Sequence, residues 1–256
     1  MPSANVRYPP ADHPFHKHSD NLRSVLKGLT QAERVHKEMI RQGNGEAIEH
    51  LRRMHGLVIG MVAEARLRKV MSDPDGFNDR ERSLIARTTS QHGRWVQAVD
   101  LAFRRQYGIA IHQEIDQHSA DLTVVTRHTT MVSLLDNDLR PIIEDRNKVA
   151  HGQWVWLLNS KETDFTGRAA SPLNYKALRS RSQLIRYLSE IVHALVVSEP
   201  TFQRDFDAIY GRLQVSKTAL DGSDYPQFAT LLRQQGLDRI TRIQAQGAGA
   251  GSTGSG

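Results

Sequence analysis

The sequence contains no cysteine, which excludes disulfide bonds, thiol nucleophiles and cysteine-ligated zinc or iron–sulfur sites. It also has no glycine-rich phosphate loop, no G-x-S-x-G elbow and no H-E-x-x-H pair. The sequence therefore lacks the signatures of three common kinds of site, one for nucleotides, one for hydrolase nucleophiles and one for zinc. We expect a protein that works without a metal or a cofactor.

Long hydrophobic runs are missing as well. No stretch approaches the roughly 18 apolar residues that a membrane span requires, and the polar, proline-containing N-terminus lacks the apolar centre of a signal peptide. We therefore expect no membrane partner and a cytoplasmic location, or a nuclear one if the source has a nucleus.

Positive charge is what the chain has in excess. Its formal charge is +6, and 26 of its 34 basic residues are arginine. Because the guanidinium fork binds phosphate better than an ammonium does, this composition favours an RNA or nucleotide partner. An arginine-rich genome would produce the same count, so both interpretations stay open.

The apolar residues recur at helical spacing along most of the 256 residues, and WVWLLN at 154–159 is the one convincing strand-like run. We predict an all-α fold that is long enough to bury a core without covalent staples. Helix starts are predicted at Ser19 and Asn78, a break near Gly93, and a long helix over 174–197. The expected organisation is a flexible arm over 1–18, N-terminal helices over 19–77, a central helical domain over 78–213, a C-terminal helical extension over 214–245 and a Gly/Ser linker or tail over 246–256.

The stretch IIEDRNKVAHGQWVW at 142–156 places an arginine where helical spacing asks for leucine. On a helix from about residue 138 to 151, Arg146 shares a face with apolar side chains. A buried, unpaired charge costs several kcal/mol. Arg146 must therefore pair with a carboxylate such as Asp116 or Asp121, line a polar cavity, or meet an anion at an interface. The apolar residues of that face are Leu139, Ile142, Ile143, Val149 and Ala150.

His151 lies about 140° around the helix from Arg146, so one helix does not easily focus both on one atom. Asn147 is four residues before His151 and shares its side, so its amide is placed to orient the imidazole or to hold a phosphate oxygen. The helix dipole at this end raises histidine basicity. The alternatives are a solvated Asn147 and an ordinary last-turn His151 before a glycine C-cap.

Residues 146–152, RNKVAHG, resemble the R-x4-6-H signature of the HEPN superfamily, including the polar residue after the arginine and the common AHG ending. These are helical bundles that include many bacterial ribonuclease toxins and defence effectors. The resemblance covers about 15 residues by motif and residues 80–200 by helical layout. The chain departs from it in its extra helices at both ends and in the strand-like insert.

The resemblance implies a homodimer in which two motifs meet in a shared cleft and cut RNA without metal, leaving a 2′,3′-cyclic phosphate. His151 would act as general acid or base, Arg146 would stabilise charge on the phosphate, and Asn147 would orient either partner. The implied role is a toxin or antiviral effector that cleaves cellular RNA, with an antitoxin or regulatory protein as a possible partner. A catalytically inactive HEPN-like module for dimerisation and partner or nucleotide binding is the main alternative, and a structural helical protein with a chance match is the third.

RNA contacts are expected on both sides of the motif. Lys148 lies inside it, although with Glu144 it also forms an ordinary i,i+4 surface pair. Trp154 forms an aromatic pair with Trp156 next to the motif; we expect core packing of a tryptophan so near a helix end, and stacking on an RNA base is the alternative. The preferred RNA track is at the start of the helix over 174–197, with a solvated helix face as the alternative; its residues are Arg179, Arg181 and Arg186. A second basic cluster consists of Arg66, Arg68 and Lys69.

Overall fold

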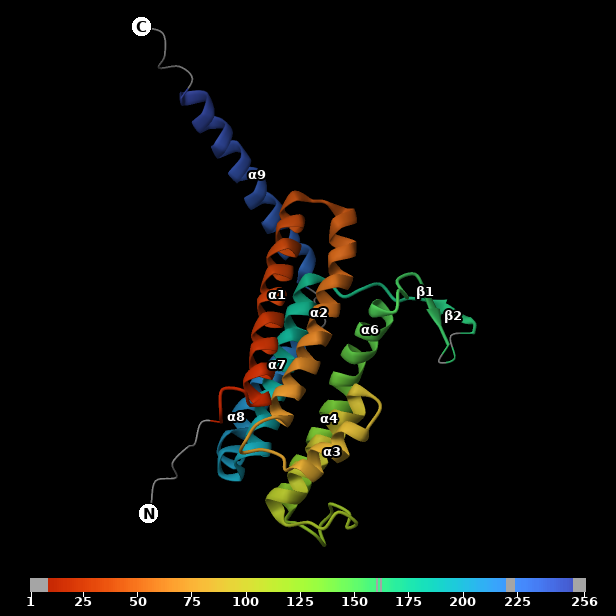
Figure 1. Cartoon of the computed structure of the whole chain (residues 1–256). Coiled ribbons are helices and arrows are strands. Elements are labelled where there is room, and N and C mark those ends of the chain that lie inside the picture. Colours follow the sequence, from red (N-terminus) through yellow and green to blue (C-terminus); the bar gives the residue numbers. More distant parts are fainter. Residues whose placement is uncertain (1–8, 160, 162, 220–223, 251–256) are drawn as a thin grey trace.

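The computed structural model describes residues 9–159, 161, 163–219 and 224–250, and over this part of the chain the prediction of an all-α fold is confirmed (Figure 1). Besides these helices, the described residues form one short two-stranded sheet. In chain order the elements are α1 (Pro14–Gln42), α2 (Gly45–Met71), α3 (Asp79–Arg87), α4 (Gln91–Tyr107), α5 (Leu122–Leu134), the π-helical turn η1 (Leu135–Leu139), α6 (Arg140–Ala150), β1 (Trp156–Leu158), β2 (Phe165–Arg168), α7 (Tyr175–Val197), α8 (Glu199–Thr218) and α9 (Tyr225–Ala250).

Side-chain caps fix where several helices begin. Asn78 accepts from the backbone N–H of Glu81, whose carboxylate accepts from the N–H of Asn78, so the predicted start at Asn78 is a complete capping box. The break expected near Gly93 lies just before it, between α3 and α4, where Ser90 caps α4. Asn174 caps α7 through the N–H of Ala177, as the predicted helix over 174–197 requires.

The N-terminal helix starts earlier than Ser19, the cap predicted for it. The ring Nδ1 of His13 accepts from the N–H of Phe15 at 3.2 Å, and Pro14 occupies the first turn, where its fixed φ suits a helix. The flexible arm predicted over 1–18 therefore does not hold from Pro14 onward, because a histidine supplies the cap instead of a serine. Residues 1–8 of that arm lie outside the described residues.

Helix α2 occupies the centre of the bundle. It runs antiparallel to α1 after the left-handed Gly43 and packs on its other sides against α6 and α7, while α8 packs along α7 (Figure 1). One hydrophobic core takes in side chains from α1 through α8, among them Leu29, Ile59, Ile142 and Phe206. The segments predicted as separate at 77/78 thus share a core, and α8 continues across the predicted boundary at 213/214 to Thr218.

The motif helix α6 follows α5 without a loop. The intervening η1 is π-helical and ends two residues before Pro141, which has no N–H to donate into the preceding turn. Helix α6 ends with His151 as its C-cap and Gly152 at φ 73°, close to the predicted end. Its buried residues are Ile142 and Ile143, whereas Val149 is only half-buried and Ala150 is exposed. The buried apolar face therefore ends about two turns earlier than its spacing predicted.

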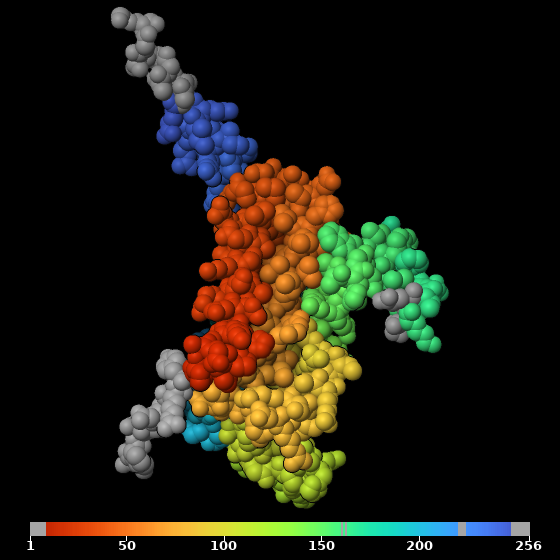
Figure 2. All heavy atoms as spheres, viewed as in Figure 1, coloured from red at the N-terminus to blue at the C-terminus, as the bar shows by residue number. Residues whose placement is uncertain are grey.

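Two elements stand out from the bundle. The predicted strand-like run forms β1, which pairs antiparallel with β2 in a hairpin that projects from the helical body (Figures 1 and 2). The start of α9 packs on α1 and α7 through Ala229 and Leu232, and the helix then extends away from the bundle. Residues 246–250, predicted to be linker, continue α9; residues 251–256 lie outside the described residues. None of the described helices is long and apolar enough to cross a membrane.

Candidate functional site

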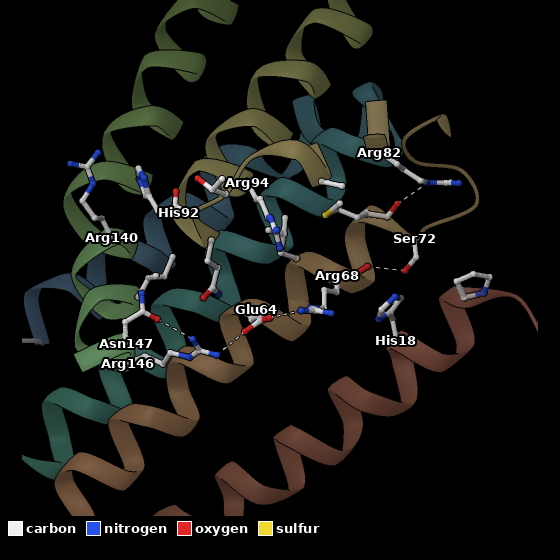
Figure 3. A pocket seen from close by; sticks show the side chains of 18 of the residues that line it. His18, Glu64, Arg68, Ser72, Arg82, His92, Arg94, Arg140, Arg146 and Asn147 are labelled. Atoms are coloured by element: carbon white, nitrogen blue, oxygen red, sulfur yellow. Dashed lines mark hydrogen bonds and ion pairs between the residues drawn. The ribbon is translucent and has the colours of Figure 1, made fainter. Parts of the chain in front are cut away.

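A cleft of about 910 Å³ opens between α2, the α3–α4 connection and α6, with the start of α1 on one side (Figure 3). That volume is at the upper end of the range of about 300–1,000 Å³ that ligand pockets occupy. Its lining is basic: five arginines face two glutamates, Glu64 and Glu144. The arginines are Arg68, Arg82, Arg94, Arg140 and Arg146, and the histidines are His13, His18 and His92.

Arg146 reaches this cleft from the motif helix. Its Nη2 donates to Glu64 Oε2 at 2.9 Å and its Nη1 donates to Asn147 Oδ1 at 2.9 Å. The side chain is 27% exposed, so its head is only partly removed from solvent. Of the three possibilities that its sequence position left open, two are realised together: Arg146 pairs with a carboxylate, and it lines a polar cavity.

The carboxylate that pairs with Arg146 is not one of the two suggested by sequence. Asp116 accepts from backbone N–H groups of its own loop, and Asp121 caps α5. Glu64 takes the role because it lies on α2, the helix on which α6 packs. Its other oxygen accepts from Arg68 Nη2 at 2.6 Å, so one carboxylate holds two guanidinium groups in the cleft. The two guanidinium groups and the one carboxylate together carry a net charge of +1, which is available to bind an anion.

His151 lies apart from this cluster. Its backbone N–H donates to Asn147 O at 3.0 Å as the cap of α6, but the residue is exposed and is not among those that line the cleft. The Asn147 amide oxygen, expected to face His151, instead accepts from Arg146. The structure therefore brings Arg146 and Asn147 together and leaves His151 outside.

The residues predicted to contact RNA lie outside the cleft too. Arg181 binds Asp145 at 2.7 Å and so ties α7 to α6. Arg186 lies over the Tyr187 ring at 4.5 Å, Arg179 is exposed, and Lys148 is half-buried near the end of α6. No cleft wall comes from α7 among the described residues, because α6 packs on α2 instead.

Trp154 packs rather than projects. Its Nε1 donates to Val149 O at 3.0 Å, and its ring lies near His50 and under the Arg53 guanidinium. This matches the expected packing more closely than base stacking. Trp156 is the exposed tryptophan, at 50%, with the Arg168 guanidinium 5.2 Å from its ring centre on the projecting hairpin.

Most of the cleft was missed at the level of sequence. The cluster of Arg66, Arg68 and Lys69 contained one lining residue, Arg68, while Arg66 donates to Ser189 on α7 instead. Arg94 and Arg140 stand alone in the sequence and meet only because α4 and α6 approach each other. No local pattern marks them.

The cleft also contains histidines with different environments. His92 Nε2 lies 3.1 Å from Asp136 Oδ1, an ion-pair distance without the alignment of a hydrogen bond, and the same oxygen accepts from Arg140 Nη2 at 2.7 Å. Burial, followed by the charge of Arg68, lowers the pKa of His18. His18 is therefore neutral at neutral pH and leaves the positive charge of this wall to the arginines.

Comparison with known proteins found no matching family model, no matching curated protein and no matching solved structure. Within the described residues, no group of three or more histidine or acidic side chains is placed to hold a metal ion. What the cleft offers is a set of guanidinium groups held in fixed positions, which bind phosphate oxygens well.

Proposed function

We propose that this protein is a metal-independent endoribonuclease of the HEPN type that binds RNA phosphates in the arginine-rich cleft and acts as a homodimer. The observation that carries the proposal is that Arg146 and Asn147, the first two residues of the R-x4-H motif, are bonded to each other in the wall of a large basic cleft. An arginine held only for packing would not require four further arginines around the same cavity.

Glu64 supports a catalytic role for Arg146 because it fixes the guanidinium without neutralising the site. A bidentate or doubly bonded arginine has a defined orientation before substrate arrives, which is what stabilisation of a transition state requires. The Glu64 carboxylate is shared with Arg68, so the cluster keeps a positive charge. A phosphodiester that approaches Arg146 therefore meets an oriented cation.

The position of His151 favours a site built from two copies. Within one subunit the exposed imidazole and the cleft are separated, so one chain does not present acid–base group and cation to the same phosphate. We propose that His151 of the partner subunit completes the cleft. Its imidazole takes the proton of the 2′-hydroxyl as the 2′-oxygen bonds to phosphorus, or it gives a proton to the 5′-oxygen as the bond between phosphorus and the 5′-oxygen breaks. The products are a 2′,3′-cyclic phosphate and a 5′-hydroxyl.

The physiological role proposed with this activity is that of a toxin or antiviral effector directed at cellular RNA, held in check by an antitoxin or regulatory protein. The test is incubation with total RNA in EDTA, followed by analysis of the fragment ends. Cleavage to 2′,3′-cyclic phosphates that His151→Ala and Arg146→Ala abolish is expected, with His118→Ala, an exposed histidine of the α4–α5 connection, as the matched control. Chelator-sensitive cleavage, or cleavage that survives His151→Ala in a folded dimer, contradicts the assignment.

The second candidate is a HEPN-type module that binds a nucleotide or a partner without cleaving. It is favoured by the same pairing of Arg146 with Glu64, because a structural ion pair between α6 and α2 has that geometry too. This candidate predicts RNA or nucleotide binding in the cleft with no fragments formed. Binding that Arg94→Ala weakens, in the absence of any cleavage, would select it.

A further inference from the structure

The outward face of α2 is apolar and uncharged at its centre. Met54 and Met61 are seven residues apart and so share one side of the helix, where they are 42% and 40% exposed. Leu57 and Val58, between them, are half-buried. Residues 54–63 contain no aspartate, glutamate, lysine or arginine, although 24% of the whole chain is charged. Methionine is common on binding surfaces, so this face is a candidate for a contact with another molecule.

Helix α6 lies beside this face and runs in the opposite direction to α2. The stem of Arg146 lies against Gly60. Further along the chain, the Trp154 ring lies 5.9 Å from the ring of His50. His151 comes between Arg146 and Trp154, so it lies nearer to the start of α2 than Arg146 does. The middle of the uncharged face is therefore flanked by the two motif residues that one subunit keeps apart.

A twofold axis perpendicular to α2, midway between Met54 and Met61, would bring those two residues together. It packs the two α2 faces antiparallel, with Met54 opposite the partner's Met61, and keeps α6 of both copies on the same side of the contact. Because it also reverses the order of levels along α2, the partner's His151 moves towards Arg146. Figure 1 shows α2 between α1 and α6, so a parallel packing would instead place the partner's α6 over α1, away from the cleft.

We propose that a second copy of this chain packs antiparallel on the α2 face, with Met54 against the partner's Met61. The inference rests on the proposed composite site and names the surface that forms it. A second copy fits because it brings an uncharged face to an uncharged face, whereas contact between basic parts of a chain with a net charge of +6 would bring like charges together. RNA does not fit, because the centre of this face has no cation to bind phosphate.

The first test uses disulfide formation, because the chain has no cysteine and an introduced thiol reports on this contact alone. Met54→Cys protein is mixed with Met61→Cys protein that carries a mass tag, and the mixture is oxidised with diamide and run on a non-reducing gel. A disulfide between the two different variants is expected. Met54→Cys alone should crosslink at least about tenfold less, since its two copies would lie about 10 Å apart along the helices at 1.5 Å per residue.

The second test measures the dimer dissociation constant by sedimentation equilibrium. Met61→Glu should raise it at least about a hundredfold, because each dimer then buries two unpaired charges at the contact. Met54→Lys added to the same chain should restore the dimer, since antiparallel packing places the two substitutions opposite each other. The matched control is Val215→Glu, at an exposed apolar position of α8, which should leave the dissociation constant unchanged.

The outcomes separate this contact from the function on which it rests. A wild-type dimer that neither crosslinks in the mixture nor responds to Met61→Glu overturns the α2 contact and leaves the composite site standing. A folded double variant, Met54→Lys/Met61→Glu, that stays dissociated overturns the antiparallel register. A monomeric wild-type protein overturns the contact and the composite site together. Circular dichroism of each variant confirms that it is folded.

Discussion

Gly60 of α2 lies directly against the stem of Arg146 on α6: a Cβ placed on Gly60 would be 2.4 Å from the Arg146 Cβ and 2.5 Å from its Cγ. Side chains do not approach each other so closely, so only glycine lets the two helices meet here. The aliphatic stem of Arg146 covers Gly60, and its head reaches Glu64 one turn further along α2. This is why an arginine occupies a position where helical spacing asks for leucine.

Gly60→Ala should therefore separate α6 from α2. We expect a loss of about 1–3 kcal/mol in the free energy of unfolding, the usual cost of overpacking. RNA cleavage should fall at least about tenfold, because a displacement of about 1 Å in a catalytic group costs more than that. Urea denaturation and a cleavage assay measure the two effects.

The matched control is Gly28→Ala, at an exposed position within α1 where an added Cβ meets nothing within 4 Å. It should stabilise the protein by about 0.5–1 kcal/mol through helix propensity and leave cleavage unchanged. Equal effects of the two substitutions would show that the packing of α6 on α2 does not depend on Gly60.

Glu64→Gln should separate binding from chemistry. Without the carboxylate, Arg68 and Arg146 attract RNA more strongly, so KM should fall. The oriented ion pair is lost, so kcat should fall as well. Both side chains are more than a quarter exposed, and the loss of stability should therefore stay near about 1 kcal/mol. Unchanged kcat in steady-state kinetics would mean that Glu64 does not position Arg146.

The cleft, rather than the start of α7, should account for the salt dependence of RNA binding. The double variant Arg94→Ala/Arg140→Ala should lower affinity and reduce the slope of log K against log salt by about 1.4, at about 0.7 for each phosphate contact to a single strand. Arg179→Ala/Arg186→Ala, on the exposed face of α7, should change the slope little. If the α7 variant reduces the slope and the cleft variant does not, RNA binds along the start of α7 instead.

Acid should destabilise the fold through a buried histidine pair between α1 and α2. His36 Nδ1 lies 3.3 Å from His55 Nδ1, and both side chains are fully buried. Burial, then the neighbouring His55 and Arg52, lower the pKa of His36 to about 3. The folded protein thus keeps this ring neutral where the unfolded chain protonates it.

The contribution of the neutral His36 ring to the free energy of unfolding is complete above the pKa of an unfolded histidine, about 6.5. It is lost as the pH falls towards the pKa in the folded protein, and the free energy of unfolding then changes with a slope that approaches about 1.4 kcal/mol per pH unit. Urea unfolding between pH 7.5 and pH 4.5 measures it. His36→Leu should show a shallower pH dependence, whereas His118→Leu, at an exposed histidine, should keep the wild-type slope. A slope unaffected by His36→Leu would place the acid sensitivity elsewhere.

Local signals predicted local structure well. The capping residue Asn78, the start of α7 near residue 174, the end of α6 at His151–Gly152 and the strand-like run at β1 were all found from short patterns, because their causes lie within a few residues. The start of α1 was misplaced because His13 acts as a cap, which is an unusual role for histidine.

Only the part of the site that lies within one short stretch of sequence was predicted. Arg146 and Asn147 were identified from the motif and do line the cleft together. Glu64, Arg94 and Gln91 were not, because they reach the cleft through the packing of α2 and α4 against α6. The spacing of apolar residues says that a helix packs, but it does not say against which partner.

The composite site is tested most directly by mixing two inactive proteins. Arg146→Ala and His151→Ala, each devoid of RNA cleavage alone, are unfolded and refolded together so that mixed dimers form, and cleavage of RNA is measured in EDTA. If Arg146 of one copy and the partner's His151 act on the same phosphate, each mixed dimer retains one intact site and cleavage returns to about a quarter of the wild-type rate. A mixture of folded dimers that remains inactive contradicts the account.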